Sequence, residues 1–247
     1  MNSIERAWRD ILFDIYKNGH IHKKDDAEIK EIVGVHKYLE NPTINVLSDT
    51  LNMEITPSDS NDYLKNIESG NYDIEGYPIK GIALAEYVKS VHNKGKQGFV
   101  YTYPNRLQAH FINENCVINQ IEVVVKRLSE NLGTNRAVMV LYDPDVDSFE
   151  EDDPKKLVED IPCLNWIQVL VRNDILNLHV QFRSNDIFTA FPSNMMLITY
   201  LGMLITEKLN EQYSNIEFGG IYYNATSAHY YTDVVDDKTI EKIFIVN

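Results

Sequence analysis

The sequence predicts a single α+β domain, because helical and strand patterns follow one another without a linker or an internal repeat between them. The chain has 247 residues, 44% of them hydrophobic, which is enough to bury a sizeable core. Apolar residues recur at helical spacing in four segments: Ile4–Asn18, Ile82–His92, Asn119–Asn131 and Asn194–Leu209. Strand patterns occupy five others: Asn45–Leu51, Ala137–Tyr142, Trp166–Arg172, Ile175–Arg183 and Ile216–Tyr223. We therefore treat residues 1–247 as one domain.

The first helix is followed by a polar segment. Its apolar face consists of Ile4, Trp8, Ile11, Leu12 and Ile15, and Gly19 is expected to end it. The stretch from His20 to Glu31 lacks apolar periodicity, so we expect an exposed loop or a short helix there.

Two of the strands form a predicted hairpin. Asn173-Asp174, a favourable pair for a tight turn, joins Trp166–Arg172 to Ile175–Arg183. The second strand alternates between an apolar face and a polar face that carries Asn177, His179, Gln181 and Arg183. The apolar face of this second strand is therefore expected in the core.

The composition limits the class of protein. With 23 Lys+Arg against 37 Asp+Glu the net charge is −14, which argues against binding to nucleic acid or to an anionic membrane. No apolar run reaches the ~18–20 residues needed to cross a bilayer, and the N-terminus lacks a secretion signal. Two cysteines, Cys116 and Cys163, indicate a reducing compartment. We expect a cytoplasmic protein.

No metal site is expected. The acidic segment Asp143–Asp153 resembles the start of a calcium loop, but Ser148 replaces the required glycine and Pro154 the final glutamate. We interpret it as a solvated connector. His20 and His22 lie in a polar, unanchored stretch.

The residues suited to catalysis lie around the hairpin. Cys163 follows Pro162 just before the first strand, and a guanidinium such as that of Arg183 favours a thiolate. A cysteine before an apolar strand is also typical of simple core packing. His179 shares a strand face with Arg183, which leaves open a Cys163–His179 thiol hydrolase. The polar run 183–194 precedes an apolar helix and predicts a lined cleft.

Several motifs, in order and spacing, resemble the thymidylate synthase family. These are Pro162-Cys163, Arg183-Ser184-x-Asp186-x-Phe188 followed by Pro192-x-Asn194, His229-x-Tyr231, and the segment Tyr101–Arg106. The resemblance is strong over 160–231, moderate over 99–142 and absent over roughly 20–95. It implies a thymidylate synthase-like fold, with a mixed sheet, flanking helices that include a buried central helix, and a homodimer formed through the sheet.

The resemblance also implies a reaction. Cys163 would attack C6 of a pyrimidine nucleoside monophosphate, so that C5 becomes a carbon nucleophile. C5 would then attack the methylene group of 5,10-methylenetetrahydrofolate, the co-substrate, with no metal involved. Hydride from the folate gives a methyl group, and water gives a hydroxymethyl group.

The implied ligands of phosphate and sugar are five residues. Arg183 and Ser184 resemble the family's phosphate ligands, because a guanidinium fork suits phosphate oxygens. Arg136 resembles the arginine that the family lends across the dimer interface to the neighbouring active site. His229 and Tyr231 resemble the pair that binds the sugar hydroxyl.

Three further residues have implied roles at the reacting groups. Tyr101 resembles the tyrosine that helps to remove the C5 proton, and Asp186 the carboxylate that holds the folate's pterin ring. Asn194 resembles the asparagine that reads the base. Its amide can pair with N3–H and O4 of uracil. The alternative for Asn194 is a helix N-cap with no ligand role.

Some features depart from the family pattern. The family's arginine-containing phosphate loop is absent, with only Lys23-Lys24 near its place, and Asn135 replaces the first interface arginine. The expected activity is methylation of dUMP to dTMP. The alternatives are hydroxymethylation of dCMP, CMP or dUMP, and a non-catalytic nucleotide-binding protein on the same scaffold.

Overall fold

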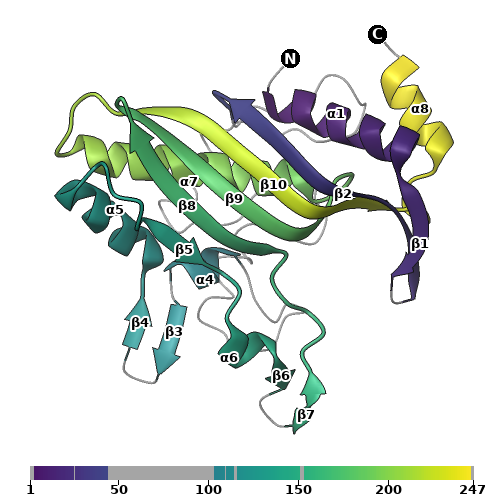
Figure 1. Cartoon of the computed structure of the whole chain (residues 1–247), viewed down its shortest axis with the longest axis horizontal. Helices are drawn as coiled ribbons and strands as arrows, with labels where there is room; N and C mark the ends of the chain where they lie inside the picture. The colour runs from purple at the N-terminus through teal and green to yellow at the C-terminus, as the bar shows by residue number, and fades with distance from the viewer. Residues whose placement is uncertain are drawn as a thin grey trace, which may run out of the picture.

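A computed structural model describes residues 3–24, 26–43, 103–108, 110–113, 116–150 and 153–245. Its centre is a sheet of six strands in the order β1-β2-β10-β9-β8-β5 (Figure 1). In that order the strands are His20–Lys24, Ala27–Glu40, Glu217–Tyr231, Ile175–Asp186, Leu164–Arg172 and Val138–Val140. Within the described sheet, β9 and β10 pair in parallel and all other neighbours are antiparallel. The sheet is therefore mixed, as expected for this α+β class.

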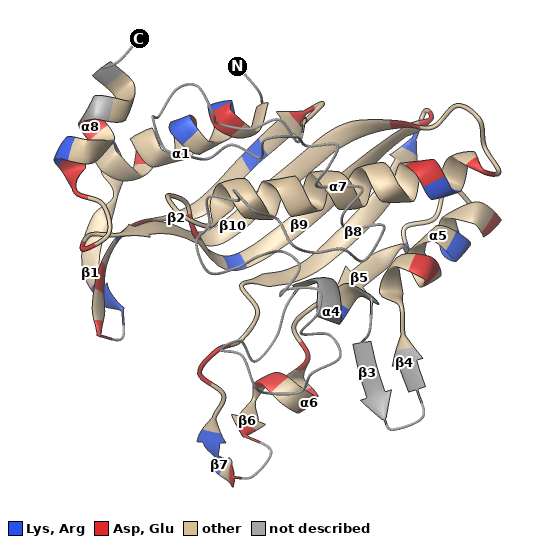
Figure 2. Ribbon diagram, turned by 180° about the vertical axis from the view of Figure 1, so that it is seen from behind, with Lys and Arg blue, Asp and Glu red and all other residues tan. Residues whose placement is uncertain are grey.

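Helices cover one face of this sheet. The described helices are α1 (Ser3–Asn18), α4 (Tyr103–Gln108), α5 (Gln120–Glu130), α6 (Pro144–Asp147), α7 (Phe191–Asn210) and α8 (Asp237–Ile245), of which α6 contacts β6 and α8 packs against α1. Figure 2 shows α7 lying along the central strands of the sheet. α1 and α5 both contact α7. Two small hairpins complete the described part: β3 (His110–Asn113) with β4 (Cys116–Ile118), and β6 (Phe149–Glu150) with β7 (Asp153–Leu157). None of the described helices combines the length and hydropathy needed to span a bilayer.

The helices predicted at 4–18 and 119–131 are confirmed. The five apolar residues expected on one face of α1 are all buried, and Gly19 ends the helix. A Cβ at Gly19 would lie 2.4 Å from the Ile15 carbonyl oxygen, so only glycine fits where the chain turns into β1. The helix expected at 119–131 is α5, whose N-cap is Asn119. The strand at 45–51 and the helix at 82–92 lie outside the described residues.

The predicted hairpin is confirmed as β8 and β9. Asn173 and Asp174 have φ angles of 51° and 62°, the conformation of a tight two-residue turn. The apolar face of β9 is fully buried against the helices, whereas its polar face is half-buried. This hairpin positions Cys163 at one end of the sheet.

Two expectations for polar segments were wrong. Residues 20–31 form β1 and the start of β2 rather than a loop or helix, because β2 pairs along its length with β10. The segment 143–153 is not simply a solvated connector, since it contains α6 and part of the β6–β7 hairpin. Asp147 is buried there and lies 2.5 Å from Arg106. Within the described ranges, no group of three or more His, Cys, Asp or Glu side chains could hold a metal ion.

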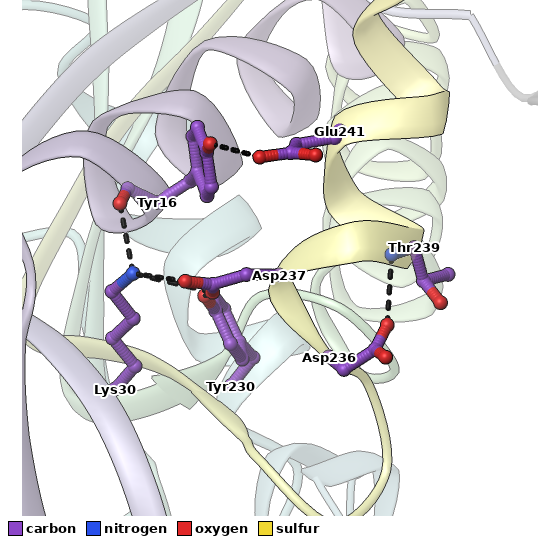
Figure 3. Close-up of polar contacts among 7 residues, drawn as sticks. All are labelled: Tyr16, Lys30, Tyr230, Asp236, Asp237, Thr239 and Glu241. Carbon is purple, nitrogen blue, oxygen red and sulfur yellow. Dashed lines mark hydrogen bonds and ion pairs between the residues drawn. The ribbon is translucent and has the colours of Figure 1, made fainter.

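A polar cluster attaches the C-terminal helix to the sheet (Figure 3). The Lys30 ammonium donates to the Tyr16 carbonyl at 2.8 Å and to the Asp237 carboxylate at 3.0 Å. The Tyr230 hydroxyl donates to the same carboxylate at 2.7 Å, and the Tyr16 hydroxyl donates to Glu241. These contacts join α1, β2, β10 and α8 beside the end of β10.

Candidate functional site

The sequence motifs converge at one end of the central sheet. Cys163 precedes β8, and its carbonyl accepts the Arg183 amide at 2.8 Å, which brings the end of β9 beside it. Asp186 at the end of β9 pairs in register with His229 of β10. The β9–α7 turn then places Asn194 in the first turn of α7. The paired ends of β9 and β10 and the first turn of α7 therefore bring together residues that are far apart in the chain.

Cys163 is half-buried, and two neighbouring residues of β9 contact its segment. The Ser184 hydroxyl lies 3.6 Å from the Cys163 Sγ. The Arg183 guanidinium donates to the carbonyl oxygens of Pro162 and Ile161 at 3.0 and 2.7 Å. Arg183 thus holds the chain before Cys163 with two of its five N–H groups, and among the described residues the other three have no acceptor and can serve a ligand.

Tyr103, to which the motifs assign no role, also contacts the segment around Cys163. The Tyr103 hydroxyl accepts the backbone amide of Leu164 at 3.2 Å, and Tyr103 is 5% exposed. It lies two positions after Tyr101, which itself falls outside the described residues. The hydroxyl fixes the amide directly after Cys163.

The Asp186 carboxylate organises the turn before α7. It accepts the amides of Phe188 and Thr189 at 3.0 and 3.2 Å and also the Thr189 hydroxyl. Burial raises the pKa of Asp186, and these hydrogen bonds and Lys24 oppose the shift. A carboxylate has about four acceptor positions, so, counting donors from the described residues, one remains for a ligand.

His229 and Tyr231 lie side by side on β10, with their ring centroids 5.3 Å apart. His229 is 2% exposed, and burial, with smaller contributions from Lys24, His22 and Arg183, lowers its pKa to about 4. The ring is therefore neutral at pH 7, and its Nδ1 lies 3.3 Å from the Ser227 hydroxyl.

Lys24 of β1 belongs to the same cluster. Its ammonium donates to the Tyr231 hydroxyl at 2.9 Å and lies 5.2 Å from the centre of that ring. The sequence showed only that Lys23-Lys24 lie near the place of the family's phosphate loop. For Lys24 the structure gives a defined partner within the site, which only the pairing of β1 with β2 could reveal.

Asn194 is connected to two buried polar side chains. Its amide Nδ2 donates to Asn185 Oδ1 at 3.2 Å, and Asn185 Nδ2 donates to the Tyr223 hydroxyl at 3.0 Å. The N-cap alternative is wrong, because α7 begins at Phe191 with Ala190 as its cap and Pro192 in the first turn. The sequence motif treats position 185 as unspecified, so it gave no signal for Asn185.

Arg136 does not join this cluster. It lies just before β5, where Val138 pairs with Gln168 and the Ala137 carbonyl accepts the Val169 amide. The corresponding point on β8 is about seven residues from Cys163, or roughly 20 Å at ~3.3 Å per residue. Within one chain, Arg136 and the thiol are at opposite ends of β8.

The thiol–histidine pair with His179 is excluded. His179 lies four residues before Arg183 on β9, about 13 Å along the strand from the Cys163 segment. Its ring stacks on Tyr222 at 4.3 Å on the polar face of the sheet. A hydrolase based on these two residues does not fit the structure.

Comparison with known proteins identifies the family. The family model described as thymidylate synthase matches residues 55–243. Similarity therefore begins within 20–95, the range in which the motifs show no resemblance. The relatives are provisionally named as thymidylate synthases. The protein from Methanocaldococcus jannaschii is 34% identical over 69% of this chain and 72% of its own length. The protein from Methanopyrus kandleri is 26% identical over 95% of this chain and 93% of its own length. The chain belongs to the thymidylate synthase family.

Proposed function

We propose that the protein transfers a one-carbon unit from 5,10-methylenetetrahydrofolate to C5 of a pyrimidine nucleotide, and that it methylates dUMP to dTMP. The observation that carries the proposal is Cys163 Sγ at 3.6 Å from Ser184 Oγ, at the sheet end where Asp186, Asn194 and His229 also lie. Family membership supports the general chemistry.

The thiol is suited to a nucleophilic role. Addition of the Cys163 thiolate to C6 leaves C5 electron-rich, and C5 then takes the methylene carbon and loses its proton as the folate is eliminated. Hydride from the folate then converts the exocyclic methylene to a methyl group, which gives dihydrofolate, and the thiolate leaves C6. The segment bearing the thiol is held by Arg183 and Tyr103, which limits its motion during the attack. Tyr101 is the proposed participant in loss of the C5 proton.

The cationic groups suit a nucleotide phosphate. The three N–H groups of Arg183 that donate to no described residue, and the Ser184 hydroxyl, can donate to phosphate oxygens. Lys24 adds a positive charge beside Tyr231 and compensates in part for the missing phosphate loop. Tyr231 and His229 are the proposed ligands of the sugar.

The base and the folate have separate proposed ligands. The Asn194 amide offers the donor and acceptor that match O4 and N3–H of uracil, which favours dUMP over a cytosine nucleotide. Asp186 keeps one acceptor position for an N–H group of the pterin ring.

The position of Arg136 supports a proposed active site that is shared between subunits. Because Arg136 is roughly 20 Å from the thiol within one chain, the proposal assigns it to a phosphate in a neighbouring subunit. The sheet face opposite α7 is covered by no described helix (Figure 1). Tyr222 contacts Tyr38 and His179 on the polar face of the sheet, and both tyrosines are exposed. We propose a homodimer through this face.

One assay tests the reaction. Tritium release is measured from C5-labelled dUMP, dCMP, UMP and CMP in the presence of methylenetetrahydrofolate. We expect release from dUMP, with dihydrofolate formed in equal amount. Release without dihydrofolate would indicate hydroxymethylation. Binding of dUMP without any release would indicate the non-catalytic alternative.

Cys163→Ala tests the nucleophile. We expect tritium release to fall at least about a thousandfold, while dUMP binding by calorimetry stays within a few fold. Cys116→Ala is the matched control and should keep wild-type release. An active Cys163→Ala variant would exclude Cys163 as the nucleophile.

A further inference from the structure

Three polar side chains form a continuous line from the core to the candidate base site. The Tyr223 hydroxyl accepts Asn185 Nδ2 at 3.0 Å, and Asn185 Oδ1 accepts Asn194 Nδ2 at 3.2 Å. Tyr223 is fully buried and Asn185 is 2% exposed, whereas Asn194 is half-buried. The line thus runs from a closed interior to a partly accessible amide.

The inner end of this line is rigidly packed. The Tyr223 ring lies 5.5 Å from Phe182 of β9 and 5.1 Å from Phe191 at the start of α7. Burial raises the pKa of Tyr223, so the hydroxyl stays protonated at any ordinary pH. A ring held between the sheet and α7 gives Asn185 a fixed partner.

Asn185 in turn restricts the orientation of the Asn194 amide. An amide has an acceptor at one end and a donor at the other, and turning it by 180° exchanges them. With Asn185 Oδ1 facing it, Asn194 must present Nδ2 on that side, because two oxygens at this distance would repel. Among the described residues, Asn194 Oδ1 accepts no hydrogen bond, so this end stays available for a ligand.

We propose that Asn185, anchored by Tyr223, is a positioning residue that fixes the Asn194 amide and thereby sets the preference for uracil over cytosine. This inference rests on the proposed function, in which Asn194 reads the base. Uracil presents N3–H and O4 where cytosine presents N3 and an amino group, so one amide orientation matches each base. Fixing the orientation gives selectivity without direct contact between Asn185 and the nucleotide.

The test compares the dissociation constants of dUMP and dCMP, measured by calorimetry without folate. We expect Asn185→Leu and Tyr223→Phe to lower the preference for dUMP by about fivefold to tenfold, the effect of one hydrogen bond. Asn185→Asp keeps an acceptor facing Asn194 and should retain the wild-type ratio at pH 8. Tyr213→Phe is the matched control, since it removes one tyrosine hydrogen bond, to the Ser129 carbonyl, outside this line.

The outcomes separate the two proposals. A wild-type protein that binds neither nucleotide would overturn the proposed function and this inference with it. A wild-type preference for dUMP that Tyr223→Phe and Asn185→Leu leave unchanged would overturn the inference alone. If Asn185→Leu does not fold, Tyr223→Phe still decides, because it keeps the ring between Phe182 and Phe191. An equal shift in Tyr213→Phe would show that the effect is general instability and would also overturn it.

Discussion

His229 shows how one buried side chain determines the response to pH. Its folded-state pKa of about 4 lies below the ordinary value of 6.5, chiefly because the ring is buried. Between these two values the unfolded chain binds a proton that the folded chain does not. Stability should therefore fall as the pH is lowered from about 6.5 to about 4, by about 3 kcal/mol at most.

His229→Gln should remove most of this pH dependence. The measurement is urea unfolding at pH 7.5 and at pH 4.5, compared between wild type and variant. His20→Gln, at an exposed position on β1, is the control and should behave like the wild type. An equal loss of stability in His229→Gln and wild type would show that other groups cause the dependence.

At the same scale, the sequence predicted the side chains that motifs specify but not the ones that support them. Cys163, Ser184, Asp186, Asn194, His229 and Tyr231 fall at one sheet end, as the motif order implied. Asn185, Tyr223 and Tyr103 act through hydrogen bonds between distant segments, and no local pattern predicts such bonds. The N-cap interpretation of Asn194 failed because α7 begins earlier, at Phe191, with Pro192 in its first turn.

At the scale of elements, the C-terminal helix depends on Asp237. Burial tends to raise the pKa of Asp237, but hydrogen bonds from Tyr230 and Lys30 outweigh it and the pKa is lowered. Its contribution to stability is present above the ordinary value of 3.8 and is lost as the pH falls through the lowered value. The Lys30 side chain is only 10% exposed and would lose its counterion.

Asp237→Asn should destabilise the protein by about 1–2 kcal/mol at pH 7. This is at the low end of the range for hydrogen bonds to a charged group, because the Asp237 side chain is 52% exposed. The difference from the wild type should shrink at a pH well below 3.8. Urea unfolding measures both. Asp233→Asn, an exposed carboxylate nearby, should change little. A constant difference at all pH values would contradict the assigned charge effect.

Several elements that sequence analysis predicted have a regular buried apolar face. α1, α5, β8 and β9 carry helical or alternating patterns because one side packs in the core. β1 has no buried residue, so it carries no such pattern, and it is a strand only because β2 pairs with it. This tertiary pairing is also what brings Lys24 to Tyr231.

At the scale of the whole molecule, the position of Arg136 makes the dimer testable. In the proposed dimer, each active site combines Cys163 of one subunit with Arg136 of its partner. Cys163→Ala and Arg136→Ala are therefore each expected to be weakly active or inactive alone. A mixed dimer of the two variants contains one site that has both the thiol and the arginine.

Refolding Cys163→Ala and Arg136→Ala together in equal amounts should restore activity. Random pairing makes half of the dimers mixed, with one complete site in two, so about a quarter of wild-type tritium release is expected. Cys163→Ala mixed with a Cys163→Ala/Arg136→Ala double variant is the control and should remain inactive. If the mixture of single variants is no more active than its components, Arg136 does not act across an interface. Because the roughly 20 Å separation prevents Arg136 from reaching the thiol within its own chain, that result would remove it from the phosphate site altogether.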